Sequence, residues 1–406
     1  MTARVLFVDS SRSLLQELET ALASARSEWA VVCARSPAEA FEQMARGEFD
    51  VVVADAAALD ANGGSFFDEV AVRHPKAARF LLSGQSGSAM LLRADTAAHQ
   101  HLARPMQAGE VFARLEQTLM LDALLSDPDL KAVVSRLKSV PSLTPVYVAI
   151  MSELRKEEAS ARRVGDLVAK DSGMAAKILQ LANSPFFGSR MAVVEPAQAV
   201  QRLGLETVRA LVLTVHVFQQ LDLRTVTRFR LGKVWRHSIA AAGFARLIAR
   251  LQDAPADVAS EAFTAALLHD IGKLVLAGSL PDDYAVIVEQ AESDDLPTWQ
   301  VELELMRTTH AEIGAYLLGL WGLPEPIVEA VARHHHPSES PAPDYCPLGA
   351  VHVADVIEHE VHPDNAIGVS SGADAPYLER FGVAARLLEW TAACLGTEAE
   401  GQKSLL

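Results

Sequence analysis

The sequence is poor in cysteine, in long apolar runs and in positive charge. Only three of its 406 residues are cysteine, and Cys33, Cys346 and Cys394 are far apart along the chain. This spacing excludes a disulfide framework and a thiolate metal site of paired cysteines, so ordinary buried thiols are expected. No stretch reaches the ~18 apolar residues of a membrane span, and the first residues lack the pattern of a signal peptide. The sequence therefore predicts a cytoplasmic location and no membrane segment.

The shortage of positive charge limits the classes of partner. Lys and Arg total 36 against 52 Asp and Glu, so the formal net charge is −16 at pH 7. Such a field repels nucleic acid and anionic lipid, so direct binding to either is not expected. Half of the residues are hydrophobic and 22% are charged, which excludes an intrinsically disordered chain. At ~150 residues per domain, the length predicts two or three domains.

The local pattern changes near residue 125. Before it, short β-branched runs alternate with helical segments, which predicts an α/β domain with a parallel sheet and helices on both faces. After it, apolar residues recur at helical spacing without a convincing strand, so the remainder is predicted to be all-helical. The predicted parts are a first domain at residues 1–122, a linker at 123–130 with a hinge at Ser126–Pro128, helical subdomains at 131–225 and 226–395, and a frayed tail at 396–406.

Four polar residues follow the predicted strands, at the edge where an open parallel sheet binds ligands. They are the carboxylates Asp9 and Asp55, the hydroxyl of Ser83 and the cation Arg104. Two carboxylates can hold Mg²⁺ while it keeps several waters, and an anionic group can then be met by the hydroxyl and the cation. In these residues the segment resembles the receiver domain of bacterial response regulators, over roughly residues 3–122. The resemblance implies a flavodoxin-like, doubly wound, five-stranded fold, Mg²⁺ bound near Asp9, phosphorylation of Asp55 and a sensor histidine kinase as partner.

The same segment departs from the receiver pattern. Ser10 stands where receivers usually carry a second acid after the first strand, which removes one negative charge from the metal site. Arg104 replaces the usual lysine, and a planar guanidinium can clamp Asp55 as a bidentate ion pair. A phosphorylated receiver and a degenerate receiver without phosphorylation both remain open, beside a flavodoxin-like fold whose acids only cap loops.

Short amphipathic helices, with Ser or Asp near their starts and Gly at their ends, are predicted between residues 126 and 220. They include the stretch Leu181-Ala182-Asn183-Ser184-Pro185-Phe186-Phe187-Gly188, in which Asn183 is expected to cap a helix or form a buried hydrogen bond. This stretch resembles the amino-terminal part of the HDOD domain, a regulatory module of bacterial signalling proteins related to the metal-dependent HD phosphohydrolases. With the helices that follow, the resemblance covers roughly residues 126–395.

Histidine is concentrated in the carboxyl-terminal half, where nine of the thirteen lie between His237 and His362. Imidazole and carboxylate are the ligands that borderline divalent metals prefer, and a core helix ending in His-Asp puts two unlike donors beside one point. The order of these residues resembles the ligand series of the HD phosphohydrolases, most closely the two-metal set of the HD-GYP phosphodiesterases. The resemblance implies divalent Fe, Mn or Zn bound by His237, His269, Asp270, His310, His334 or His335, and Asp355, with Lys273 meeting a phosphate if the domain is a hydrolase. His216, His359 and His362 are expected to be structural.

Two departures weigh against an enzyme. Residues Pro337–Pro343 contain no Gly-Tyr-Pro loop, and His336 stands where a glutamate is expected after the paired histidines. HDOD modules also commonly lack the catalytic ligands and activity of HD enzymes. The sequence therefore favours a response regulator of a two-component phosphorelay whose HDOD output acts through a downstream protein partner, with homodimerisation left open. A metal-dependent phosphohydrolase or phosphodiesterase acting on a nucleotide or cyclic dinucleotide is the alternative, and ligand sensing without turnover lies between them.

Overall fold

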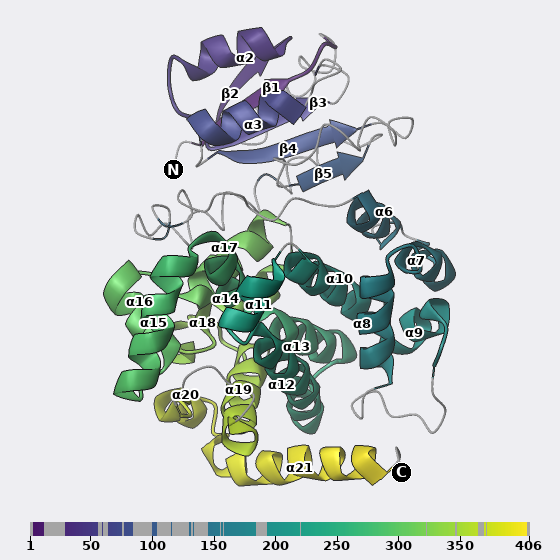
Figure 1. The fold of residues 1–406 in the computed structure, drawn as a ribbon, viewed down its shortest axis with the longest axis vertical. Coiled ribbons are helices and arrows are strands. Elements are labelled where there is room, and N and C mark those ends of the chain that lie inside the picture. The colour runs from purple at the N-terminus through teal and green to yellow at the C-terminus, as the bar shows by residue number, and fades with distance from the viewer. Residues whose placement is uncertain are drawn as a thin grey trace. The chain divides into compact units, whose positions relative to one another are not determined.

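A computed structural model gives the fold of the chain (Figure 1). The residues that it describes are 3–11, 29–55, 59, 64–74, 77–83, 100–103, 115, 130, 133, 145–154, 156, 158–183, 193–219, 221–321, 323–345, 347–363, 369–370 and 372–403. Two compact units divide the chain, residues 1–148 with 317–323, and residues 149–316 with 324–406. The predicted linker at 123–130 lies outside the described residues except for Leu130. Within the described part, no helix is both long and apolar enough to cross a membrane.

The first unit contains a parallel sheet. Its described strands are β1 (Arg4–Val8), β2 (Ala30–Ala34), β3 (Val51–Asp55), β4 (Ala78–Ser83) and β5 (Gln100–Ala103), in the order β2-β1-β3-β4-β5. All four neighbouring pairs are parallel. This strand order is that of flavodoxin-like folds, in which the chain reverses direction across the sheet between β1 and β3. The predicted parallel α/β architecture of the amino-terminal segment is confirmed.

One face of this sheet is covered by α2 (Pro37–Met44) and α3 (Gly64–Arg73). Alternate strand residues such as Leu6, Val52 and Leu81 form a buried apolar cluster with Met44 and Phe67 from these helices. The intervening residues of the same strands, including Val5 and Val53, are buried as well. Burial on both faces explains why strands such as β1 and β3 are largely continuous apolar runs instead of alternating apolar and polar residues.

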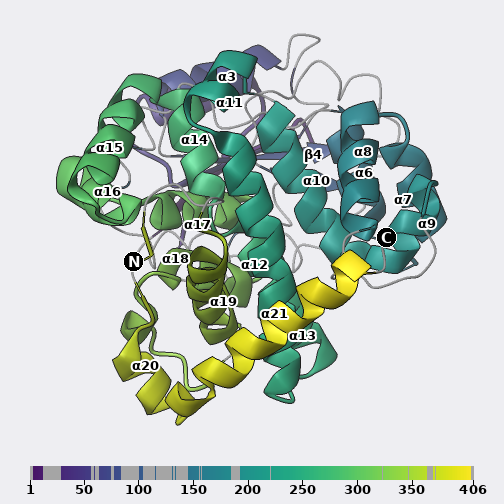
Figure 2. The ribbon, with the colours of Figure 1, turned by 60° about the horizontal axis from the view of Figure 1, so that its bottom comes forward.

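The remainder of the described chain is helical, as predicted (Figures 1 and 2). The first group of helices is α6 (Pro145–Leu154), α7 (Ala161–Val168), α8 (Ser172–Ala182), α9 (Pro196–Leu203), α10 (Leu205–Gln219) and α11 (Leu223–Arg228). The second group is α12 (Leu231–Leu251), α13 (Ala256–Leu268), α14 (Ile271–Ser279), α15 (Pro281–Asp294), α16 (Thr298–Met306), α17 (His310–Leu320), α18 (Glu325–Arg333), the 3-10 turn η2 (Pro337–Glu339), α19 (Leu348–Val361), α20 (Ala375–Arg380), the 3-10 turn η4 (Ala384–Arg386) and α21 (Leu387–Lys403).

Helix α12 is the centre of the second group. It packs against α13 and α19, and Figure 2 shows the three lying side by side. Its buried face is rich in alanine and includes Gly243, which lets neighbouring helices approach closely. The three helices therefore form a rigid support for side chains that point between them.

Asn183 behaves as the sequence predicts. It is the C-cap of α8, its side-chain nitrogen donates to the Val193 carbonyl at 2.8 Å, and its side-chain oxygen accepts from the Val193 N–H at 2.8 Å. The amide side chain thus replaces a backbone partner and joins the end of α8 to the segment before α9.

The end of the chain differs from the sequence prediction. Helix α21 extends through Gly396 to Lys403, so the frayed tail predicted from about residue 396 is wrong over most of its length. A glycine inside a helix costs only about 1 kcal/mol relative to alanine, and the residues after Gly396 include the strong helix formers Glu398, Ala399 and Glu400.

Candidate metal centre

Five helical segments bring the predicted metal ligands together. Helix α12 supplies His237, the junction of α13 and α14 supplies His269 and Asp270, the start of α17 supplies His310, the end of α18 supplies His334 and His335, and α19 supplies Asp355. Of these seven residues, all but His335 are buried. The structure thus gathers every predicted ligand, and the choice between His334 and His335 disappears because both face the same centre.

Local sequence explains how the α13–α14 junction reaches the centre. The apolar residues Ala262–Leu268 bury the end of α13, and His269 and Asp270 follow as its C-cap and the N-cap of α14. A Cβ atom on Gly272 would lie 1.9 Å from the carbonyl oxygen of His310. Only glycine permits this approach, which places Asp270 Oδ1 3.1 Å from His310 Nε2.

The first group of donors consists of His237, His269 and Asp355, and we call it position A. The Nε2 atoms of His237 and His269 are 3.0 Å apart, and Asp355 Oδ1 lies 3.0 Å from His237 Nε2 and 3.6 Å from His269 Nε2. Two nitrogen ligands at about 2.1 Å from one cation are about 3.0–3.4 Å apart. Position A therefore has the separations of ligands around a single metal ion.

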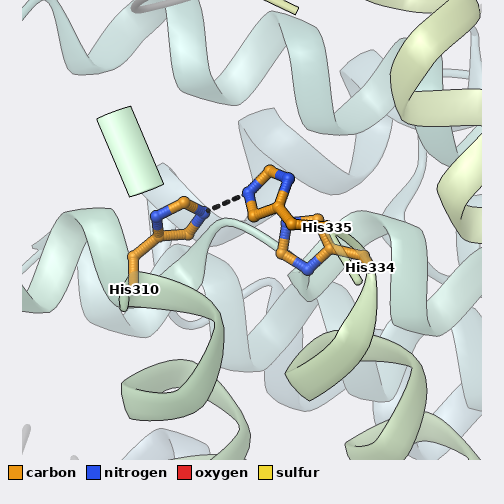
Figure 3. A group of neighbouring side chains, drawn as sticks. All are labelled: His310, His334 and His335. Atoms are coloured by element: carbon orange, nitrogen blue, oxygen red, sulfur yellow. Dashed lines mark hydrogen bonds between the residues drawn. The ribbon is translucent and has the colours of Figure 1, made fainter. Parts of the chain in front are cut away.

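The second group consists of His310, His334 and His335, and we call it position B (Figure 3). The Nε2 atoms of His310 and His335 are 3.1 Å apart, and Figure 3 shows the His334 ring beside them. Asp270 lies between the two positions, because its Oδ1 is 3.1 Å from His310 Nε2 and 3.6 Å from His269 Nε2. A carboxylate in this place can serve both positions.

Hydrogen bonds at the opposite ring nitrogens determine which nitrogen faces the centre. His269 Nδ1 lies 2.6 Å from the carbonyl oxygen of Ala266, and His334 Nδ1 lies 2.7 Å from that of Val331. A carbonyl can only accept, so each Nδ1 donates a proton to it, and Nε2 is the nitrogen that remains to bind a metal. Among the described residues, nothing hydrogen-bonds to His334 Nε2. Lone pairs that face inward without a donor are the arrangement that a cation satisfies.

The cluster also carries an excess of buried negative charge, which bound cations would offset. Four carboxylates, Asp270, Asp355, Glu302 and Glu358, are buried here with one ammonium, Lys273, whose Nζ is 2.9 Å from Asp270 Oδ2. With neutral imidazoles, four negative charges and one positive charge leave a net charge of about −3, which is costly away from water. One or two divalent cations would bring this charge close to zero.

The pKa values of several buried histidines and carboxylates in the cluster are shifted by their charged neighbours and by burial. Burial alone would lower the pKa of His237, but Asp355 and Glu358 outweigh it and raise the pKa to about 10. Burial opposes ionisation of Asp355 also, yet the surrounding histidines hold the pKa of its carboxyl well below the usual range. His334 and His335 differ, because burial and neighbouring imidazoles hold the pKa of each ring well below the usual range. The ionised carboxylates and the neutral rings of His334 and His335 are in the forms that bind metals, whereas His237 would lose a proton when a cation binds.

Together these observations fit two divalent cations of the borderline class. Imidazole and carboxylate donors suit Zn, Fe and Mn, and each position has at least three of them. His237, His269 and Asp355 would hold one ion, His310, His334 and His335 the other, with Asp270 between them.

Three members of the cluster were not identified as part of it from the sequence. Glu358 accepts a hydrogen bond from His237 Nδ1, and Glu302 Oε2 lies 2.7 Å from His310 Nδ1. His359, expected to be structural, has its Nδ1 3.0 Å from Asp355 Oδ1 and belongs with His237 and Glu358 to a further group able to hold a metal. The spacing of three and four residues after Asp355 on α19 was the available signal for Glu358 and His359.

His352 has a different place from Asp355, although both are on α19. Its Nδ1 lies 2.7 Å from the carbonyl oxygen of His334, and its Nε2 accepts from the N–H of Asp374 at 2.8 Å. Both ring nitrogens are thus engaged by the backbone, so His352 supports the end of α18 and is not a candidate ligand.

The two predicted receiver acids lie at one edge of the sheet. Val8 pairs with Ala54, so Asp9, directly after β1, and Asp55, the last residue of β3, lie at the point where strand order reverses, and both are buried. Ser10 is exposed, and Asp9 Oδ1 accepts from the Ser11 N–H at 2.7 Å. Ser83 ends β4, the next strand. Arg104 lies outside the described residues, so the predicted ion pair with Asp55 stays a prediction.

Comparison with known families matches a large part of the helical region. Residues 140–337 match the family model of the HDOD domain. The chain carries an HDOD domain. The match ends before α19, so the HDOD domain as matched includes the predicted ligands from His237 to His335 but not Asp355.

Three individual proteins show the extent of the similarity. An uncharacterized protein of Treponema pallidum (strain Nichols) is 25% identical over 217 residues, which are 53% of this chain but only 41% of that protein. A solved structure from Shewanella amazonensis SB2B, described as a candidate phosphohydrolase, is 24% identical with a TM-score of 0.51, covering 70% of this chain and all of that one. An HDOD protein of unknown function from Geobacter sulfurreducens is 21% identical with a TM-score of 0.51, covering 72% of this chain and 99% of that one. At these identities the two structures share the fold with this chain.

Proposed function

We propose that this protein is a bacterial response regulator whose HDOD output is a metal-dependent phosphohydrolase of the HD type. Its substrate class is a nucleotide or cyclic dinucleotide. The observation that carries the proposal is the convergence of seven imidazole and carboxylate donors on one centre, with facing Nε2 atoms 3.0 and 3.1 Å apart. Such a set, drawn from five helical segments, is far more than the packing of a helical core requires.

The residues of the centre have distinct tasks in this proposal. The donors of positions A and B would hold two divalent cations. Once bound, these cations would neutralise the negative charge that builds on a phosphorus centre during hydrolysis. Lys273 adds a fixed positive charge for a phosphate, and Asp270 holds its Nζ at 2.9 Å. The pKa of Lys273 is raised, because Asp270 outweighs the effect of burial, so the ammonium stays charged. His335 is the least buried of the donors.

The receiver-like domain is proposed to control this output. Asp9 and Asp55 end neighbouring strands at the sheet position where flavodoxin-like folds bind ligands. We assign Asp55 as the phosphoacceptor and Asp9 as a Mg²⁺ ligand, with Ser10, Ser83 and Arg104 completing the pocket. A sensor histidine kinase would supply the phosphoryl group, and phosphate at Asp55 would bias the conformational equilibrium of the chain.

Incubation with a small phosphodonor and Mg²⁺, followed by intact mass measurement, tests this assignment. The expected result is a gain of one phosphoryl group in the wild type and none in Asp55→Ala. A gain that persists in Asp55→Ala would show that the acceptor is another residue, and no gain in the wild type would favour a degenerate receiver.

A second candidate is an output that acts by binding a downstream protein, with metals serving as structural ions. Burial favours this candidate, because six of the seven donors are buried and closed metal sites are typical of structural ions. The lack of a Gly-Tyr-Pro loop after His336 also favours it.

Metal analysis and hydrolysis assays on the full chain distinguish the two candidates. The wild type, its His269→Ala/Asp270→Ala variant and Asp55→Ala as a matched acid-to-alanine control are compared. Each is reconstituted with Mn, Fe or Zn and offered a panel of nucleotides and cyclic dinucleotides. The hydrolase proposal expects about two ions per chain and a hydrolysis product in the wild type and the control, with both lost in the double variant; the product is free phosphate from a phosphomonoester or a linear dinucleotide from a cyclic one. Bound metal without any hydrolysis product would favour the protein-binding output, and no bound metal after reconstitution would overturn the hydrolase.

A further inference from the structure

Two glutamates outside positions A and B accept hydrogen bonds from the Nδ1 atoms of histidines whose Nε2 atoms face the centre. Glu358 on α19 accepts from Nδ1 of His237, a residue on α12 that is 121 positions away. Glu302 on α16 accepts from His310 twice, because its Oε2 lies 2.7 Å from both Nδ1 and the backbone nitrogen. Neither carboxylate is among the donors of positions A and B.

Both glutamates are completely buried, with 0% of each residue exposed. Burying a carboxylate without strong partners costs several kcal/mol, so its presence needs a compensating interaction. Glu358 Oε1 lies 3.4 Å from His362 Nδ1, and Glu302 receives the two bonds from His310. In each case the shortest contact is with a ring whose other nitrogen faces the metal centre.

The two positions repeat one arrangement. In position A, Nδ1 of His237 donates to a glutamate and Nδ1 of His269 donates to a backbone carbonyl. In position B, Nδ1 of His310 donates to a glutamate and Nδ1 of His334 donates to a backbone carbonyl. Each position thus has one imidazole hydrogen-bonded to a carboxylate and one hydrogen-bonded to a carbonyl, and the two imidazoles come from different helices.

We propose that Glu358 and Glu302 are positioning residues that set metal affinity separately, Glu358 at position A through His237 and Glu302 at position B through His310. The inference rests on the proposed two-metal centre and assigns a division of labour within it. A carboxylate opposite Nδ1–H holds the ring in one tautomer and one orientation and increases the electron density at Nε2. Partners of this kind typically change metal affinity by about 10–100-fold.

Glu302→Gln and Glu358→Gln in the full chain test the proposal. A glutamine oxygen can still accept from Nδ1–H, so the shape of the site is kept while the negative charge is removed. Glu153→Gln is the matched control, because Glu153 is also a buried glutamate with a cationic partner but lies on α6, outside the cluster. Circular dichroism checks that each variant retains its helical content.

Metal affinity is measured by chelator competition with Mn and Zn, and the visible spectrum of Co²⁺ reports the surroundings of each position. The expected result is two affinities in the wild type and in Glu153→Gln. Glu302→Gln should weaken one of them by about 10–100-fold and Glu358→Gln the other. Adding His334→Ala to Glu302→Gln should abolish position B and leave position A at wild-type affinity.

Three results would overturn the inference. Affinities within about twofold of the wild type in both variants would show that the glutamates only fill space, and equal weakening of both positions by either variant would contradict a separate action. If the wild type binds no divalent metal, both the inference and the hydrolase proposal fail. If it binds two ions but hydrolyses no substrate, only the hydrolase proposal fails, and the metal affinities of Glu302→Gln and Glu358→Gln still test the inference.

Discussion

Metal removal should destabilise the helical domain measurably. Lys273 is the one buried lysine beside the four buried carboxylates of the described centre, so bound cations would contribute to the stability of the fold itself. An ion present at 100 times its dissociation constant stabilises the native state by about 2.7 kcal/mol, so two such ions contribute about 5 kcal/mol. For a domain of this size, 1 kcal/mol corresponds to about 2–4 °C in unfolding midpoint, which predicts a decrease of about 10–20 °C.

The assay is differential scanning calorimetry of the metal-loaded chain with and without a chelator. The metal content is determined beforehand, and adding Mn or Zn back should restore the midpoint. The variant His269→Ala/His334→Ala removes one donor from each position and should lose most of the response, while Asp55→Ala should keep all of it. An unchanged midpoint after chelation of a chain that had held two ions, or an equal decrease in the donor variant, would refute the charge argument.

Three further predictions concern packing and charge. Gly272→Ala should destabilise the chain by about 1–3 kcal/mol in urea unfolding and weaken metal binding, because the new methyl group meets the His310 carbonyl at 1.9 Å; a stable, metal-replete variant would contradict the close approach. Asn183→Ala should cost about 1–3 kcal/mol through loss of both bonds to Val193, measured the same way, and no change would mean that water replaces them. The hydrogen bond from Lys156 lowers the pKa of Glu153, so this carboxylate stabilises the fold at pH 7, and the effect is lost as pH falls from its ordinary value of 4.5 through the lowered pKa of the folded state. Glu153→Gln should therefore cost about 1 kcal/mol at pH 7 and progressively less towards pH 3, and a cost independent of pH would exclude a charge effect.

The architecture followed closely from local patterns. Continuous apolar runs such as Val51–Asp55 are typical of strands buried on both faces, and the structure has a parallel sheet where those runs occur. Asn183 likewise behaves as its position after an apolar helix suggests. The tail beyond Gly396 was the exception, because one glycine is a weaker signal than the helix formers around it.

The candidate metal donors could be named from the sequence, but their arrangement could not. Histidine and aspartate are residue types that suit a divalent cation, and the resemblance to the HD ligand series picks out His237, His269, Asp270, His310 and Asp355 among them. Which nitrogen of each ring faces the centre depends on the group behind it. That group is a backbone carbonyl three residues earlier in some cases and a glutamate from a distant helix in others.

Tertiary packing alone therefore decided the roles of Glu302 and Glu358, and it moved His359 into the cluster. A glutamate in a helix is usually a solvated residue, and nothing in its neighbours along the chain shows that it will be fully buried against a histidine 121 positions away. The sequence determines which side chains can bind a metal, because that is a property of each residue. The fold determines their distances, tautomers and partners, because these depend on how the helices pack.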